Sequence, residues 1–550
     1  MYTRPVSAVH DDDDHSLRRT RVVVDGANLG IDDIVAVARK GADVELSGER
    51  ELRDTLVSGR RHLRGAIDRG APLYGITTGF GDSAHRRIPT DAARQLQENL
   101  VRFLGCGTGP TAPPDVVRAV MLVRANTLAR GHSGVRTELV DQLLLLLNHA
   151  ITPRIPEEGS VGASGDLVPL SYVAAVLSGE READYQGLTR PAAQALAMAG
   201  MRPLVLELKE GLALVNGTAF MTGIAALAVA DARRLALLAD VTTALATEVL
   251  HGRSDPFSSF VHEVAKPHPG QIRSASRVRS LLRTSRLADP SACVGPDEGT
   301  GLQGDKALGY AELPRAVQDK YSLRCAPQFT GVLWDTLDWV ERWLTVEINS
   351  SNDNPLIDPA TGEVVAAGNF AGGHVALAMD ALRTAVASVA DLVDRQLALV
   401  VDEKFNAGLT PNLIPRREHG DPEHGLHHGF KGMQLACSSL TAEALALTMP
   451  LTAFSRSTEC HNQDKVSMGT TAARRTRDVI TLTEKAAAIH LLALCQAADL
   501  RGPDRLGGTR VLHERVRNHV PTVDRDRPMD TDIAHVLHLL YNGTLLEDLP

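Results

Sequence analysis

The sequence DVVRAVMLVRANTLARG, from Asp115 to Gly131, repeats apolar residues at intervals of three and four. That spacing places the apolar side chains on one face of an α-helix, and the glycine at its end is a usual stop signal. No strand-like alternation interrupts the run. The stretch therefore predicts a helix whose apolar face packs into a core.

The same pattern continues through most of the chain. It recurs in VRTELVDQLLLLLNHAI, which follows soon after, and in the segments 218–250, 332–349, 373–401, 441–451 and 472–498. Strand signals are short and local, as in RVVVDG near the start and EVVAAGNF at residues 363–370. Such long helical segments predict a mostly α protein built on a long central helical bundle.

The composition is that of a globular protein of 550 residues, long enough for a large core. Apolar residues make up 43% of the chain, and the net charge of −9 argues against general affinity for nucleic acid or anionic membranes. Charged residues interrupt the longest apolar stretches, which argues against a membrane span. Six scattered cysteines without a CxxC pair favour reduced thiols, so we expect a cytoplasmic protein.

These patterns divide the chain into four predicted parts. Residues 1–20, with the run HDDDDH, are expected to be a disordered acidic tail. Residues 21–215 form an N-terminal domain, residues 216–500 the central helical bundle, and residues 501–550 a C-terminal helical extension. Polar, glycine-rich segments separate the helices, and function is expected in such joints of a rigid scaffold.

Common cofactor motifs are absent from the sequence. GTGLQGDK, at residues 299–306, resembles a phosphate-binding loop, but an aspartate precedes the lysine and no serine or threonine follows it. HEVAKPH, at residues 262–268, has the wrong spacing for a zinc-binding helix, which its proline would also break. No GxSxG elbow or dinucleotide fingerprint occurs. We therefore expect neither a metal nor a nucleotide cofactor.

The segment GASGD, at residues 162–166, offers an electrophile made from the chain itself. In a tightly bent loop the backbone nitrogen of Gly165 can attack the carbonyl carbon of Ala163, and loss of water closes a five-membered ring. Loss of the Ser164 hydroxyl then leaves an exocyclic methylidene, to which an amine can add. Gly165 tolerates the torsions that the ring requires. The alternative is an ordinary turn in which Ser164 or Asp166 caps the next helix.

Further motifs give this segment a context. GSVGASGDLVPLSYVA, YGITTGFG, NGT, QDKYSLRCAPQ, NSSNDNPLID, GNF and HNQD together resemble the ammonia-lyases and 2,3-aminomutases that use a methylidene-imidazolone group and act on histidine, phenylalanine or tyrosine. The resemblance runs from about residue 73 to about residue 502. It implies a fumarase- or aspartase-like helical bundle with a smaller N-terminal region that bears a lid and the cofactor.

The resemblance also implies the cofactor and the assembly. The cofactor would be 4-methylidene-imidazol-5-one, formed autocatalytically from Ala163, Ser164 and Gly165. The partners would be a small aromatic amino acid and three further copies of the chain, in a homotetramer whose sites combine loops of several chains. Neither nucleic acid nor a membrane is expected as a partner.

Tyr74, in YGITTGFG, would be the base that removes a β-hydrogen from the substrate. The glycines beside it suit a mobile lid. An ordinary tyrosine has a pKa near ~10, so a phenolate requires nearby positive charge or hydrogen bonds. The alternative is a core aromatic residue beside a glycine turn.

Binding roles follow from the same resemblance. Arg324 would hold the substrate carboxylate by two parallel hydrogen bonds, and Asn354 would assist it. Positions expected to line the cofactor or the reacting centre are Asn216, Gln318, Tyr321 and Phe370. Structural hydrogen bonding at helix ends is the alternative for the two amide residues among them.

Phe103 and Leu104, in ENLVRFLGCG, match the positions that select the substrate ring in the family. Two apolar residues favour a bare phenyl ring, whereas histidine-specific members carry a Ser-His pair there and tyrosine-specific members usually a histidine. Gln463 stands where histidine lyases have a glutamate. Segments similar to phenylalanine ammonia-lyases add three binding-site candidates, for which a solvated polar loop is the alternative: Lys431, Glu459 and Asn462.

We therefore expect an ammonia-lyase that converts L-phenylalanine to trans-cinnamate and ammonia. An aromatic 2,3-aminomutase that forms β-phenylalanine or β-tyrosine uses the same residues, and the tightness of the lid decides between the two. Tyrosine or histidine ammonia-lyase, a fumarase-like lyase without a built-in cofactor, and a helical binding protein that has lost catalysis are further alternatives.

Overall fold

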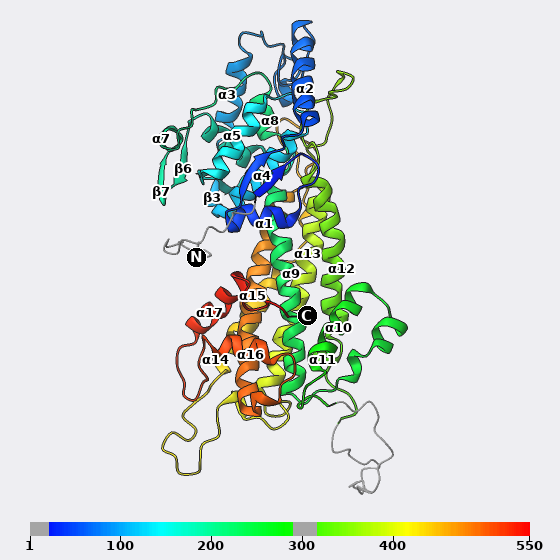
Figure 1. Ribbon diagram of the computed structural model, residues 1–550, viewed down its shortest axis with the longest axis vertical. Helices are drawn as coiled ribbons and strands as arrows, with labels where there is room; N and C mark the ends of the chain where they lie inside the picture. Colours follow the sequence, from blue (N-terminus) through cyan, green and yellow to red (C-terminus); the bar gives the residue numbers. More distant parts are fainter. Residues whose placement is uncertain (1–20, 290–315, 550) are drawn as a thin grey trace. The chain divides into compact units, whose positions relative to one another are not determined.

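The computed structural model describes residues 21–289 and 316–549. The predicted acidic tail and the segment GTGLQGDK lie outside the described residues. Within them the chain is mostly helical, as Figure 1 shows, which confirms the predicted fold class.

The described residues form two compact units. The first comprises Met1–Ala230, Val340–Asp380 and Pro450–Arg477, and the second comprises Asp231–Trp339, Ala381–Met449 and Asp478–Pro550. Four of the five boundaries fall inside long helices: α9 (Ala219–Val249), α12 (Ala326–Ile348), α13 (Gly373–Val401) and α15 (Gly469–Arg501). The division into four parts stays a prediction.

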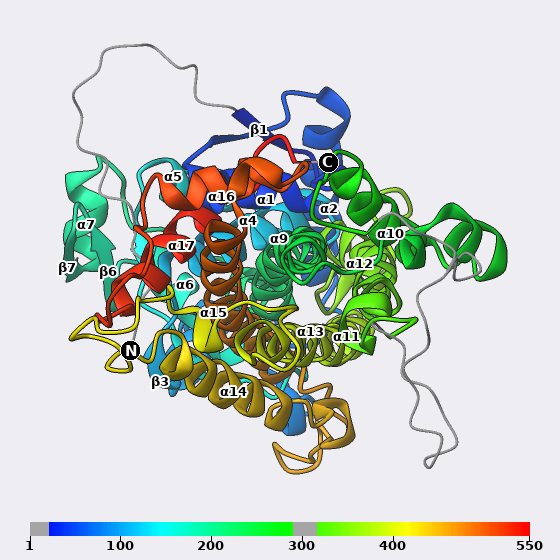
Figure 2. The ribbon, with the colours of Figure 1, turned by 90° about the horizontal axis from the view of Figure 1, so that it is seen from below.

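The four long helices contain the segments in which the sequence predicts helices. Within the second unit, Figure 2 shows them end-on and beside one another. Their inner side chains are mostly alanine, leucine and valine and are fully buried. A helix that is apolar on several faces is stabilised by packing against its neighbours rather than by intrinsic helix propensity. These helices therefore form the core of that unit.

The other helices of the first unit are shorter. They are α1 (Ile31–Lys40), α2 (Arg50–Asp68), α3 (Ala93–Phe103), α4 (Pro114–Ala129), α5 (Thr137–Asn148), α6 (Leu167–Leu177), α7 (Ala192–Met198) and α8 (Glu210–Val215). The second unit adds α10 (Pro269–Leu282), α11 (Tyr321–Arg324), α14 (Lys431–Ala446), α16 (Arg510–Arg517) and α17 (Asp530–Tyr541).

Strands are short and lie in the first unit. β1 (Arg21–Val24) and β2 (Asp43–Leu46) pair in parallel, with Arg21 opposite Asp43. The antiparallel groups are β3 (Thr108–Thr111) with β5 (Pro156–Glu158), β4 (Thr152–Pro153) with β6 (Glu182–Tyr185) and β7 (Leu188–Pro191), and β8 (Leu356–Ile357) with β9 (Val364–Val365). The predicted strand in RVVVDG is thus confirmed as β1.

Helix α4 is the helix predicted from DVVRAVMLVRANTLARG. Pro114 occupies its first turn, where the missing N–H of proline costs nothing. From Ala119 to Ala129 every residue is buried, including the polar side chains of Arg124 and Asn126. Buried polar groups require partners. Asn126 has them, since it accepts from Gly26 N–H at 2.9 Å and donates to the Ile348 carbonyl at 3.0 Å.

Candidate active site

The GASGD segment is a tightly turned loop between β5 and α6. Gly162, Ser164 and Gly165 have φ angles of +68°, +51° and +68°. The left-handed conformation costs a residue with a Cβ roughly 1–2 kcal/mol, so the loop holds Ser164 under backbone strain. Ala163 and Gly165 are buried, whereas Ser164 is half-buried. The strained residue is therefore also the one that solvent and small molecules can reach.

Asn216 lies against this loop. Its side-chain N–H donates to the Ser164 carbonyl at 2.9 Å, and the backbones of Gly165 and Gly217 pair side by side. A Cβ on Gly165 would collide with the Gly217 carbonyl. Glycine is thus required at position 165 by space as well as by torsion.

Asp166 anchors the end of the loop. Its side chain is fully buried, accepts from the Ser160 hydroxyl and from Met221 N–H at 2.8 Å each, and accepts from the Thr470 hydroxyl. Burial raises the pKa of Asp166, although these hydrogen bonds oppose the rise. Asp166 N–H donates to the Gly217 carbonyl at 2.8 Å. The loop is therefore held from both its backbone and its side chains.

The two residues that precede α15 support the other side of the loop. The Ser467 hydroxyl donates to the Gly162 carbonyl at 2.9 Å, and Met468 N–H donates to the Val161 carbonyl at 3.0 Å. Upstream, the buried carboxylate of Glu157 accepts two hydrogen bonds from the Arg477 guanidinium, at 2.6 and 2.8 Å. Paired hydrogen bonds of this kind fix orientation as well as distance.

Tyr74 is half-buried in the segment that matches a lid. Gly81 N–H donates to the Tyr74 phenol oxygen at 2.9 Å. Burial raises the pKa of Tyr74, the Gly81 hydrogen bond lowers it, and the Glu459 carboxylate raises it further. The net direction is upward, so the phenol is neutral in this arrangement.

Glu459 joins the segment that contains Tyr74 and Gly81 to a second strained segment. A Cβ on Gly81 would collide with the Glu459 carboxylate, which also accepts from the side chains of Asn462 at 2.9 Å and Gln463 at 3.1 Å. Three successive residues that begin at Glu459 have left-handed φ angles of 52°, 51° and 65°. Such strain in side chains with a Cβ clusters at functional sites. The structure thus brings together four predicted residues: Tyr74, Glu459, Asn462 and Gln463.

Helix α3 carries the two residues predicted to select the substrate ring. Leu104 is buried where the helix ends, and Phe103 is 61% exposed. Gln97 of the same helix is fully buried, donates to the Gly75 carbonyl at 2.8 Å and accepts from Leu212 N–H at 2.9 Å. The helix that ends in this pair therefore also touches the residue beside Tyr74.

Gln97 is a residue that the sequence reasoning missed. It stands at a helical spacing from the buried Ala93 and Leu100, on the apolar face of α3. A polar residue at such a position is the available signal, because a buried amide must find partners.

Asn354 and Phe370 belong to one stretch of the first unit. Asn354 is buried, and its side-chain oxygen accepts from Ala367 N–H at 2.8 Å. Phe370 lies three residues after Ala367 and is half-buried. Beside Asn354, the fully buried Asp353 forms an ion pair of 2.5 Å with Lys209, which no sequence pattern indicated.

The remaining predicted residues lie in the second unit. Tyr321 is 69% exposed, and the guanidinium carbon of Arg324 lies 4.7 Å from the centroid of its ring. Arg324 also donates to the Asp319 carbonyl at 3.1 Å. Gln318 is exposed, as is Lys431 at the start of α14. Gln318, Tyr321 and Lys431 are thus exposed and Arg324 is half-buried, and all four side chains carry hydrogen-bond donors.

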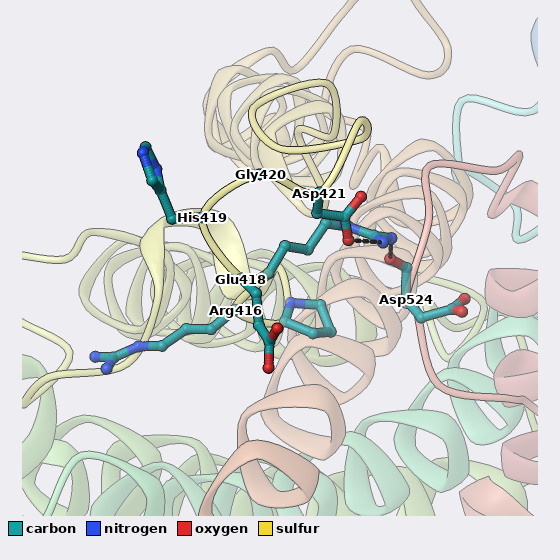
Figure 3. Close-up of a pocket in the computed structure, with 8 residues that line it drawn as sticks. Arg416, Glu418, His419, Gly420, Asp421 and Asp524 are labelled. Carbon is teal, nitrogen blue, oxygen red and sulfur yellow. Dashed lines mark hydrogen bonds and ion pairs between the residues drawn. The ribbon is translucent and has the colours of Figure 1, made fainter.

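The second unit also has a hollow of about 670 Å³ with mixed charges, shown in Figure 3. Its lining comes from residues 415–421 and Asp524 and includes none of the predicted site residues. Arg417 pairs with Asp421 at 3.3 Å and donates to the Asp524 carbonyl at 2.8 Å, while His419 points away from them. Among the described residues no group of three or more histidine, cysteine, aspartate or glutamate side chains could hold a metal ion. The hollow therefore offers no group of such side chains that could hold a metal ion.

Comparison with known proteins identifies the family. A model of the aromatic amino acid lyase family matches residues 29–518. A histidine ammonia-lyase of Gloeobacter violaceus is 42% identical over 96% of this chain and 97% of its own. The MIO-dependent tyrosine 2,3-aminomutase of Streptomyces globisporus is 39% identical over 96% of each chain.

Solved structures agree with these relatives. The tyrosine aminomutase of Streptomyces globisporus superposes with a TM-score of 0.88 at 38% identity, over 96% of this chain and 98% of that one. The phenylalanine aminomutase of Pantoea agglomerans gives 0.86 at 35% identity, over 95% and 99%. The chain belongs to the aromatic amino acid lyase family. It is an enzyme of the carbon–nitrogen lyase class, in a family that includes aminomutases, and the resemblance read from the sequence motifs is confirmed.

Proposed function

We propose that this enzyme is a phenylalanine ammonia-lyase, which converts L-phenylalanine to trans-cinnamate and ammonia. The observation that carries the proposal is the strained Ser164 loop, with Asn216 on one side and Ser467, just before α15, on the other. A loop that only caps a helix does not need to be held on both sides. Asp166 does not cap α6, because its side chain accepts hydrogen bonds from other side chains and from α9.

The loop fits a methylidene-imidazolone. Gly165 has no room for a side chain, Ala163 is small and buried, and Ser164 is partly open to a ligand. Once formed from these three residues, the group would supply an electrophile for the amino group of the substrate.

Other residues of the chain would position the substrate and move its proton. Arg324 offers a guanidinium for the carboxylate, and its contact with the Tyr321 ring limits its rotamers. Tyr74 would accept the β-hydrogen as a proton at its phenol oxygen, which must first lose its own proton. Since burial and Glu459 hold its pKa up, a positively charged side chain contributed by another copy of the chain, such as Arg324, would favour the phenolate.

The choice of phenylalanine is supported by the end of α3. Leu104 is buried and Phe103 is apolar, so a substrate ring beside them would meet no hydrogen-bond partner from this pair. Gln463 donates to Glu459 and carries no charge that would suit an imidazole. The decisive experiment is incubation of the purified enzyme with phenylalanine, tyrosine and histidine separately, with identification of each product. Cinnamate from phenylalanine as the main product supports the proposal, and turnover of histidine alone refutes it.

An aromatic 2,3-aminomutase is the second candidate. The similarity to aminomutases of known structure favours it. The same incubation separates the two activities, because an aminomutase returns a β-amino acid and releases little free ammonia.

The substrate pocket gives a first prediction. Phenylalanine should be preferred over tyrosine, because an unpaired buried phenol hydroxyl costs roughly 1–3 kcal/mol, or about a ten- to hundredfold preference. Phe103→His should offer that hydroxyl a partner and raise the kcat/KM for tyrosine relative to that for phenylalanine. An unchanged ratio would show that position 103 does not face the ring.

We also propose a homotetramer. α14 and the turn after it present an apolar surface, with Leu435 at 72% exposure and Leu445 and Met449 exposed as well. The stretch Lys431–Ala453 is long and apolar enough to resemble a membrane span by composition, although little of it is buried. A second copy of the chain would cover this surface, and the exposed Tyr321 and Arg324 would then complete sites on neighbouring chains.

Light scattering of the active enzyme tests the assembly. The expected mass is that of four chains, without detergent. Leu435→Glu should place a charge in the contact and reduce both the mass and the activity. An active monomer would contradict the shared site, and a requirement for detergent would favour a membrane instead.

A further inference from the structure

Arg124 is the one arginine of α4 with a completely buried side chain. Its terminal Nη2 donates to the carbonyls of Ala213 and Asn216, the latter at 2.9 Å. These carbonyls lie at the C-terminal end of α8, where the last turn of a helix leaves acceptors without intrahelical partners. A cation there also complements the helix dipole. Arg124 therefore fixes the turn that leads from α8 into Asn216 and Gly217.

The turn fixed by Arg124 is the one that touches the Ser164 loop. Gly217 lies between Arg124 and Gly165. A Cβ on Gly217 would collide with Nη1 of Arg124, and a Cβ on Gly165 would collide with the Gly217 carbonyl. The guanidinium and the two glycine backbones thus stack without room for a side chain. Any displacement of Arg124 would change how Gly165 is supported.

A purely structural purpose accounts poorly for this arginine. Nε and Nη1 of Arg124 have no hydrogen-bond partner among the described residues. Burial lowers the pKa of Arg124 to about 10, and the Asp353 carboxylate, which is paired with Lys209, opposes that change. Arg124 is still a cation at neutral pH. A buried charge with three of its five N–H donors unused costs stability, and an apolar side chain of similar size would avoid that cost.

We propose that Arg124 is a positioning residue for the closure of the ring from Ala163, Ser164 and Gly165. This inference rests on the proposed function. In that closure a bond forms between Gly165 N and the carbonyl carbon of Ala163. The carbonyl oxygen leaves as water with the hydrogens of Gly165 N and Ser164 N, and the Ser164 hydroxyl leaves as a second water with the Cα hydrogen. An intramolecular attack depends steeply on geometry, and a misplacement of about 1 Å can cost on the order of a hundredfold in rate.

The test is the mass of the intact denatured chain, which falls by two water molecules when the ring has formed. Wild type is expected to be fully cyclised. Arg124→Met, which keeps the volume but removes the charge and the donors, is expected to be largely uncyclised, and Arg124→Lys partly cyclised. Arg383→Met is the matched control, since Arg383 is also fully buried and donates to the Met449 carbonyl at 2.8 Å in the second unit. It should cyclise like wild type.

Circular dichroism identifies the folded variants among which the masses are compared. If Arg124→Met does not fold, Gly217→Ala serves instead, because its methyl group separates the guanidinium from the loop while Arg124 remains. The inference would be overturned if folded Arg124→Met is fully cyclised. If Arg124→Met does not fold, full cyclisation of Gly217→Ala would overturn it. Wild type without the loss of two waters would overturn the proposed function itself, and the two failures are therefore distinguishable.

Discussion

The Ser164→Ala variant is expected to fold normally and to lose ammonia-lyase activity by about a thousandfold or more. Under the proposed function its hydroxyl is the leaving group that creates the alkene, and no other residue of the loop can supply one. Removal of a group that bonds covalently to the substrate has effects of this order in other enzymes. The fold should survive, because the Asn216 hydrogen bond goes to the Ser164 backbone carbonyl, which alanine retains. Initial rates with phenylalanine and the mass of the denatured chain measure the two consequences.

Ser171→Ala is a matched control for this experiment. Ser171 is a buried serine of α6, whose hydroxyl donates to the Val168 carbonyl at 2.7 Å. Its variant should keep the mass change and most of the activity. Near-normal turnover by Ser164→Ala would mean that the electrophile does not come from Ser164.

The helical architecture follows from the sequence because long buried helices leave a strong periodic signal. Residues 218–250 and 373–401 were predicted almost to the residue as α9 and α13. The signal was weaker for α14, which begins at Lys431 and ends at Ala446 although the apolar pattern indicated residues 441–451. Most of α14 is exposed in the single chain, so the inward face is narrow and its period is hard to recognise.

Local patterns indicate the parts of the site but not their arrangement. The need for glycine at position 165 could be stated from the sequence, whereas its reason in space, the Gly217 carbonyl, is a tertiary contact. The left-handed run that begins at Glu459 has no sequence signal, because non-glycine residues adopt it only when their surroundings impose it. The sequence does not set Arg124 apart from other polar residues of a helix, because its complete burial depends on tertiary packing.

Replacement of Tyr74 by phenylalanine is expected to lower kcat by about a hundredfold or more and to leave KM for phenylalanine nearly unchanged. The substitution removes only the oxygen proposed to take the β-hydrogen, and general-base catalysis contributes about 10²- to 10⁴-fold. Since the folded protein raises the pKa of Tyr74, the phenolate fraction grows with pH over the neutral and alkaline range. The kcat/KM of wild type should therefore rise with pH, and the residual rate of Tyr74→Phe should not follow that rise.

Glu459→Gln tests the cause of the raised pKa separately from the base itself. The Glu459 carboxylate disfavours the phenolate by charge repulsion, so its removal lowers the pKa of Tyr74 and moves the rise in kcat/KM to lower pH. Tyr185→Phe, on β6, is the control for loss of a phenol elsewhere and should retain the wild-type profile. If the pH dependence of kcat/KM is the same in Glu459→Gln as in wild type, Glu459 does not influence the pKa of the base. Normal turnover by Tyr74→Phe would assign proton removal to another residue, with Tyr321 the first candidate, because its exposed phenol lies beside the guanidinium of Arg324.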